Sequence, residues 1–153
     1  MSSIHRICPE CGSFLTDEKT CRDYFNQMLA WDFEDPADTG RLHHLTVLCY
    51  CLQHPDLYSS EALEGAKQLL RDIIEKNISA QGLLKKNRKT LAPKGRTWKI
   101  KGTLENHGEY RSKIKWSMTA SEVCAHGLNR YNELVQKWAE SIYEDLKTSG
   151  NLV

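Results

Sequence analysis

The feature that most constrains this chain is the stretch Cys-Pro-Glu-Cys-Gly at residues 8–12. Two thiolates separated by two residues can bind one Zn²⁺ from a single tight turn. Pro9 stiffens such a turn, and Gly12 allows a positive φ, so that backbone N–H groups can point at the sulfur atoms. A redox-active pair is the competing interpretation, but such pairs normally open a helix beside a strand, and no strand is expected before this motif. The motif therefore predicts a zinc knuckle within residues 1–15.

A closed tetrahedral zinc site needs two further ligands. Cys21 is the third candidate because it lies only ten residues after Cys11. His43 is the fourth candidate, and His44 and His54 are alternatives. His43 and His54 lie eleven positions apart, or about 16 Å along a continuous helix, so one ion cannot bind both. The prediction is one Zn²⁺ held by Cys8, Cys11, Cys21 and His43.

The remaining cysteines have simpler explanations. Cys49 and Cys51 fall inside an apolar run, and residues two apart on a helix point about 200° away from each other, so they cannot chelate together. We interpret both as core residues. Cys124 and His126 are interpreted as incidental neighbours near the start of the last helix.

Apolar spacing predicts a mainly α fold, a small helical bundle in one domain over residues 1–153. Residues 16–76 are expected to form helices. The first is capped by Thr16 or Asp17 and ends at Asp35-Pro36, the second spans Leu42 to Gln53, and the third follows Ser59-Ser60. Residues 118–149 are expected to form one C-terminal helix, from about Thr119 to Thr148, opened by a capping box at Thr119–Glu122. Its apolar stripe comprises Leu128, Tyr131, Val135, Trp138, Ile142 and Leu146.

Residues 77–117 form a basic insertion between these helices. From residue 85 to residue 115 there are eleven basic residues and two acidic ones, although the whole chain has 21 basic and 20 acidic residues. Alternation on both sides of Gly102 and Gly108 favours a β-hairpin between Arg96 and Trp116. One face would carry the candidate nucleic-acid contacts Lys99, Lys101, Arg111, Lys113 and Lys115. The aromatic residues would lie on the opposite face, so a solvated basic face is the favoured interpretation.

The first twelve residues lack the apolar core that a signal peptide needs. No apolar stretch reaches the roughly 18 residues that a bilayer-spanning helix requires. We therefore expect a cytoplasmic protein without membrane contact. In that reducing compartment, the cysteines are expected to bind metal rather than to form disulfides.

Several of these motifs together resemble an uncharacterised family of small bacterial proteins. They are Cys8-Pro-x-Cys11-Gly, then Cys21, then the helix His43-His-Leu-Thr-Val-x-x-Tyr50-x-Leu-Gln-His54-Pro, and a C-terminal Trp138-Ala-Glu-Ser segment. The resemblance covers about residues 8–58 and 116–146. It implicates Cys8, Cys11, Cys21, His43 and His54 but implies no activity. Many members have an acidic residue where this chain has Leu48, which weakens any carboxylate-assisted hydrolytic site.

These features lead to three hypotheses. The favoured one is a zinc-stabilised interaction or regulatory protein without catalysis. Its expected partner is another protein, which the sequence does not identify. The first alternative is a metal-dependent hydrolase that uses His43, His44 and His54, with water as the open metal ligand. The second is nucleic-acid binding through the basic segment 85–115.

Overall fold

The computed structural model describes residues 6–15, 18–34, 42–77 and 100–152. Their element order is β1 (Arg6–Ile7), β2 (Phe14–Leu15), α1 (Cys21–Glu34), α2 (His43–Gln53), a 3₁₀ turn η2 (Pro55–Leu57), α3 (Ser60–Lys76), α5 (Ala120–Cys124) and α6 (Leu128–Thr148). The predicted mainly helical fold is confirmed. No helix in the described ranges combines the length and the apolar character needed to cross a membrane.

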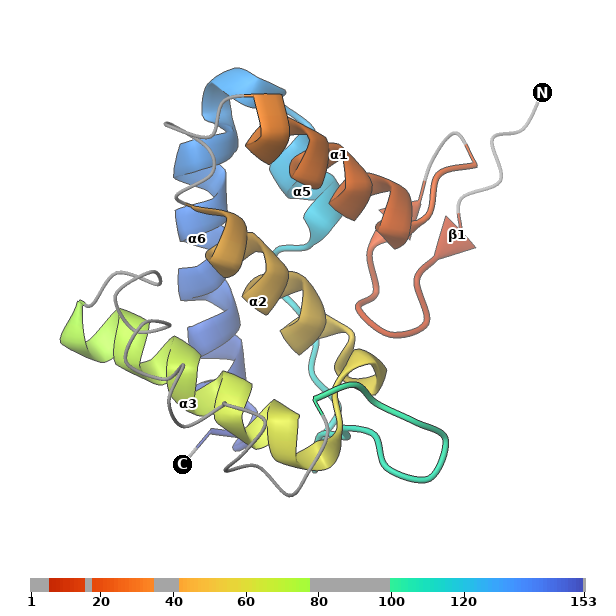
Figure 1. Ribbon diagram of the computed structural model, residues 1–153, viewed down its shortest axis with the longest axis vertical. Helices are drawn as coiled ribbons and strands as arrows, with labels where there is room; N and C mark the ends of the chain where they lie inside the picture. Colours follow the sequence, from red (N-terminus) through yellow and green to blue (C-terminus); the bar gives the residue numbers. More distant parts are fainter. Residues whose placement is uncertain (1–5, 16–17, 35–41, 78–99, 153) are drawn as a thin grey trace.

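Helix α6 forms the centre of the bundle and packs against α2, α3 and α5 (Figure 1). Its predicted apolar stripe is confirmed from Tyr131 to Leu146, because the core-facing residues Tyr131, Val135, Trp138, Ile142 and Leu146 are fully buried. Leu128, the first residue of that stripe, is 41% exposed instead. Helices α1 and α2 lie side by side and run in opposite directions (Figure 1).

The predicted continuous C-terminal helix is wrong, because the chain forms two helices there. Gly127 has φ 73°, a left-handed conformation that glycine adopts without steric cost, and it separates α5 from α6. Thr119 is the N-cap of α5, as expected, but its side chain makes no capping hydrogen bond. The Thr119 hydroxyl instead donates to Ser13 Oγ at 3.0 Å, which connects the N-terminal loop to α5.

The predicted β-hairpin is not formed in residues 100–116. Within this range the only ladder contact is one isolated bridge between Lys101 and Tyr58, whereas residues 96–99 lie outside the described ranges. A Cβ at Gly102 would collide with the carbonyl oxygens of Asp56 and Tyr58. Gly108 is equally constrained, since a Cβ there would lie 2.7 Å from the Leu63 side chain. These glycines therefore permit close packing of a loop against η2 and α3; they do not form a hairpin turn.

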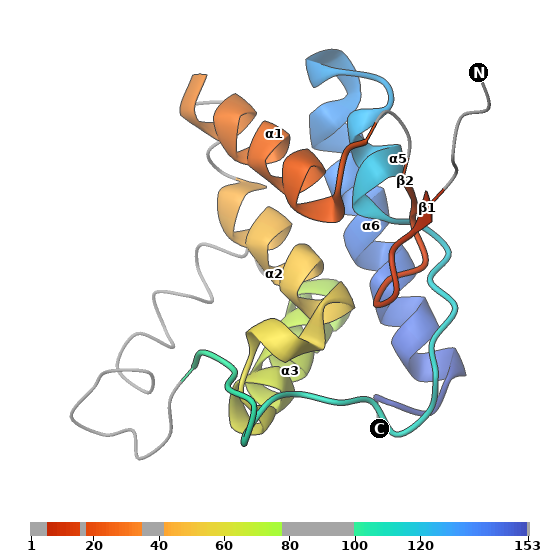
Figure 2. The same ribbon diagram turned by 90° about the vertical axis from the view of Figure 1, so that its right-hand side faces the viewer.

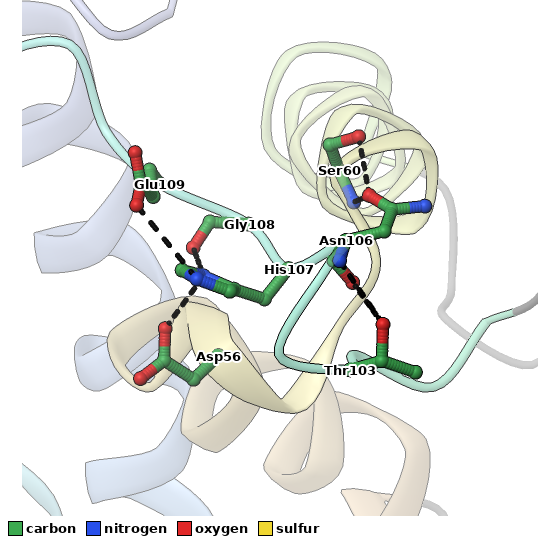
Figure 3. Close-up of polar contacts among 7 residues, drawn as sticks. All are labelled: Asp56, Ser60, Thr103, Asn106, His107, Gly108 and Glu109. Atoms are coloured by element: carbon green, nitrogen blue, oxygen red, sulfur yellow. Dashed lines mark hydrogen bonds and ion pairs between the residues drawn. The ribbon is translucent and has the colours of Figure 1, made fainter.

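Polar contacts fix this loop to the start of α3 (Figure 3). Asn106 Oδ1 accepts hydrogen bonds from the Ser60 backbone N–H at 3.1 Å and from the Ser60 hydroxyl at 2.9 Å. The Asn106 backbone N–H donates to Thr103 Oγ1 at 3.0 Å. His107 Nδ1 lies 3.0 Å from Asp56 Oδ1 in η2, and its Nε2 lies 3.8 Å from Glu109 Oε1. Residues 100–109 thus serve as a clamp over η2 and the start of α3.

Candidate metal centre

The N-terminal Cys-x-x-Cys loop is closed by a short antiparallel ribbon. Strand β1 precedes the motif, contrary to expectation, and pairs with β2 so that Ile7 lies opposite Phe14. The Gly12 N–H donates to the Cys8 carbonyl at 2.9 Å, and the Cys8 N–H donates to the Ser13 carbonyl at 2.9 Å. Gly12 has φ 75°, which explains the need for glycine after Cys11. The ribbon and the turn place both thiols on the inner side of the loop.

Cys21 is the first residue of α1, and this helix start is capped by residues that the sequence reasoning missed. The Asp23 N–H donates to Thr20 Oγ1 at 3.2 Å, while the Thr20 N–H donates to Asp23 Oδ2 at 2.7 Å. This reciprocal pair is a capping box formed with aspartate. The expected caps Thr16 and Asp17 lie outside the described residues. The positive end of the helix dipole lies at Cys21, so it would offset part of the negative charge of a metal-bound thiolate there.

His54 is the residue that ends α2 and turns toward the loop. Its Nδ1 lies 2.8 Å from the Tyr50 carbonyl oxygen, one of the carbonyls that a helix end leaves without an intrahelical partner. With its proton on Nδ1, the imidazole donates this hydrogen bond. The lone pair of Nε2, which lies 3.8 Å from Cys8 Sγ, is then available to bind a metal. The Tyr50 ring stacks between His54 and Phe25, with centroid distances of 4.2 Å and 4.1 Å. The spacing Tyr50-x-x-x-His54 is the sequence signal for this arrangement.

Four potential metal ligands converge at this point. The ligand atoms of Cys8, Cys11, Cys21 and His54 all lie within 4.8 Å of one another. Cys11 Sγ and Cys21 Sγ lie 3.4 Å apart. All four residues are buried, with exposed fractions of 8%, 4%, 5% and 6%. No other group of three or more histidine, cysteine or acidic side chains in the described ranges is as compact.

The protons of this cluster are shared unequally. A hydrogen bond from the Cys21 thiol lowers the pKa of Cys11 to about 4, although burial acts in the opposite direction and His54 assists. The same hydrogen bond raises the pKa of Cys21, and burial adds to this effect. Burial alone would lower the pKa of His54, but hydrogen bonds to Cys11 and to the Tyr50 carbonyl raise it to about 9. A thiolate beside a protonated imidazole is therefore favoured, and a bound cation would replace these protons.

His43, the predicted fourth ligand, is not part of this cluster. Its Nδ1 lies 3.1 Å from Asp32 Oδ2, near the end of α1. His44 is exposed, with its ring edge-on to His43 at a centroid distance of 5.5 Å. The structure therefore does not bring His43, His44 and His54 together, and the fourth position of the cluster belongs to His54.

The other candidate residues lie outside the cluster. Cys49 is fully buried, which raises the pKa of its thiol, and Cys51 is partly buried, so both have the predicted core environment. Cys124 Sγ lies 3.4 Å from the Tyr24 carbonyl oxygen, and His126 is exposed. Among the predicted nucleic-acid contacts, Lys101, Arg111, Lys113 and Lys115 are exposed, and Lys99 lies outside the described residues.

A groove of about 530 Å³ lies directly over the cluster. Cys8, Cys21 and His54 contribute to its wall, together with Glu10 and Arg22. Arg22 is the positively charged side chain of this wall, and it can offset negative charge at the thiolates.

Comparison with known proteins identifies a family. The chain matches the family of unknown function DUF5946 over residues 6–147 and therefore belongs to it. No curated protein and no solved structure matches the chain.

Proposed function

We propose that this protein binds one structural Zn²⁺ through Cys8, Cys11, Cys21 and His54, and that the ion holds the N-terminal loop against the start of α1 and the end of α2. The observation that carries the proposal is the convergence of four buried ligand atoms within 4.8 Å of one another. Without a metal, this point would hold a buried thiolate–imidazolium pair, and removing both of its charges from water is costly.

The ligand types favour zinc. Three cysteines and one histidine form one of the usual structural zinc sets, tetrahedral and closed. Soft thiolate ligands select against Mg²⁺ and Ca²⁺, which prefer oxygen. Zn²⁺ with three thiolates and a neutral imidazole has a net charge of −1. The positive charge of Arg22 in the groove wall offsets this negative charge. The hydrogen bond from His54 Nδ1 to the Tyr50 carbonyl orients the imidazole, as the outer ring nitrogen of a metal-bound histidine normally does.

A closed site does not support metal-assisted hydrolysis, since no coordination position remains for water. The hydrolase alternative also requires His43, His44 and His54 in one place. His43 instead begins α2 and contacts Asp32, whereas His54 lies at the other end of this helix. We therefore propose a non-catalytic role for the metal, in a protein that acts through binding or regulation.

Metal analysis of purified variants tests the ligand assignment. Native mass spectrometry and elemental analysis are expected to find one zinc per wild-type chain. Cys8→Ser, Cys11→Ser, Cys21→Ser and His54→Ala should each lose it or bind it much more weakly. His43→Ala and Cys51→Ser are matched controls from the same helix and should retain full occupancy. A wild type without zinc after zinc-replete expression, or loss of zinc only in His43→Ala, would contradict the proposal.

Cobalt substitution tests the closed coordination. Co²⁺ bound by thiolates and one imidazole in a tetrahedron gives characteristic visible absorption bands. With four protein ligands these bands should not change when azide is added, because no position is open to it. An azide-dependent spectrum would indicate an exchangeable ligand and would favour the hydrolase alternative.

A further inference from the structure

The segment between the clamp and α5 has two unlike sides. Tyr110, Ile114 and Trp116 are partly buried and pack against the helical core. Arg111, Lys113 and Lys115 alternate with them and are exposed. Figure 2 shows this segment running from the foot of α3, past the C-terminal end, to the start of α5. We refer to Arg111, Lys113 and Lys115 as the basic row.

The backbone that carries the basic row is anchored at both ends. Near its start, Asn151 Oδ1 accepts from the Arg111 N–H at 2.8 Å, and Asn151 Nδ2 donates to the Ser112 carbonyl at 3.1 Å. At its end, the Ser117 N–H and hydroxyl donate to the two carboxylate oxygens of Asp145, each at 2.7 Å. The three cations are therefore presented in a fixed order on an anchored backbone.

The basic row has no ion-pair partner within the part of the chain that the structure describes. None of its three cations forms an ion pair with a described residue, whereas Lys67, Arg71 and Lys76 on α3 each pair with an acidic side chain. Arg111 also borders a cleft of about 330 Å³, whose wall contains Lys67 and Arg71 together with Glu64 and Glu109. The cleft thus carries charges of both signs, and the unpaired positive charge lies in the basic row itself.

We propose that the basic row binds the phosphate backbone of a nucleic acid. Three exposed cations that follow one another along an anchored chain fit a partner whose negative charges repeat along a line. The aromatic side chains of the segment face the core and are not available for base stacking, so binding should be independent of base sequence. An anionic membrane is disfavoured, because the outward side of the segment has no apolar side chain to insert into lipid.

Fluorescence anisotropy over a salt series tests this proposal. The probes are a labelled random-sequence DNA duplex and a labelled single-stranded RNA, with the zinc-loaded wild-type chain. Three phosphate contacts predict a contribution of about −2.7 to the slope of log K against log salt concentration on the duplex, equivalent to an affinity loss of about 40-fold between 50 and 200 mM salt. Arg111→Ser/Lys113→Ser/Lys115→Ser should lose this contribution on both probes.

A matched variant removes the same charge elsewhere. Arg130, Lys137 and Lys147 are exposed cations of α6, and replacing all three with Ser should leave the salt slope unchanged. Vesicles containing phosphatidylserine should not bind the wild type. Absence of nucleic-acid binding, an equal loss in both triple variants, or an unchanged slope in the basic-row variant would overturn the proposal. Vesicle binding that depends on the row would do so too. None of these outcomes depends on the zinc-ligand variants.

Discussion

A chain of buried hydroxyl and carboxyl groups joins α1, α2 and α6 and permits a quantitative prediction. Tyr131 of α6 is fully buried, and its hydroxyl donates to Asp32 Oδ1 at 2.9 Å. The Thr46 hydroxyl lies 2.7 Å from the same Tyr131 oxygen. We expect Tyr131→Phe to destabilise the protein markedly, because this change keeps the ring but removes the atom that joins the other two groups.

The magnitude follows from these two contacts. A hydrogen bond to a charged group contributes about 1.5–3 kcal/mol, and a neutral one about 1 kcal/mol. No cavity opens, since phenylalanine fills the ring site of Tyr131, and Thr46 can partly recover by bonding to a carbonyl of its own helix. We therefore expect the free energy of unfolding to fall by about 2–4 kcal/mol at pH 7.

Urea denaturation of zinc-loaded protein, followed by circular dichroism, measures this difference. Thr46→Val, which removes only the neutral contact, should cost less, and the double variant should cost less than the sum of the two. The Tyr131 hydrogen bond also opposes the raised pKa of Asp32, so the cost of Tyr131→Phe should grow as pH rises through that pKa. A cost below about 0.5 kcal/mol, the range of ordinary surface changes, would refute the reasoning.

Three further changes test other contacts. Burial raises the pKa of Asp32 above its ordinary value of 3.8, so its contribution to stability is full below that value and is lost as pH rises. The stability of the wild type relative to Asp32→Asn, measured by denaturation at a series of pH values, should therefore fall as pH rises above 3.8. Ser13→Ala removes the acceptor of the Thr119 hydroxyl and should cost about 1 kcal/mol, speed amide exchange in α5 and leave zinc bound. Asn106→Ala removes the partner of the Ser60 N–H, so it should cost about 1 kcal/mol and speed proteolysis of the clamp; unchanged cleavage would contradict this role.

Much of the helical fold could be predicted because its signals are local. The buried second helix lies between His43 and Gln53 as expected, and the third begins at Ser60 with Ser59 as its N-cap. The split between α5 and α6 was missed because a single glycine inside an amphipathic pattern does not reveal its φ. Only the fold shows that Gly127 adopts a left-handed conformation at this point.

The basic insertion shows why alternation alone does not predict a hairpin. Tyr110, Ile114 and Trp116 do face the core, as period two requires, but the segment packs on helices and pairs with no strand. An extended chain on a helical bundle and a strand in a sheet have the same sequence period. Gly102 and Gly108 resembled turn residues, yet their role depends on the backbone of residues 55–58 and on the Leu63 side chain of α3, which approach only in the folded chain.

The fourth position of the metal centre depends on the relative direction of α1 and α2. Cys21 and His43 each begin a helix, which led to the prediction that both face the N-terminal loop. Consecutive helices that pack side by side run in opposite directions, so the start of one lies beside the end of the other. Cys21 therefore lies beside His54 at the end of α2, while His43 lies beside Asp32 near the end of α1. This helix pair is thus joined by polar contacts at both ends, a Cys₃His cluster at one and a carboxylate–imidazole pair at the other. The same eleven-residue separation that prevents His43 and His54 from sharing one ion assigns each histidine to its own end.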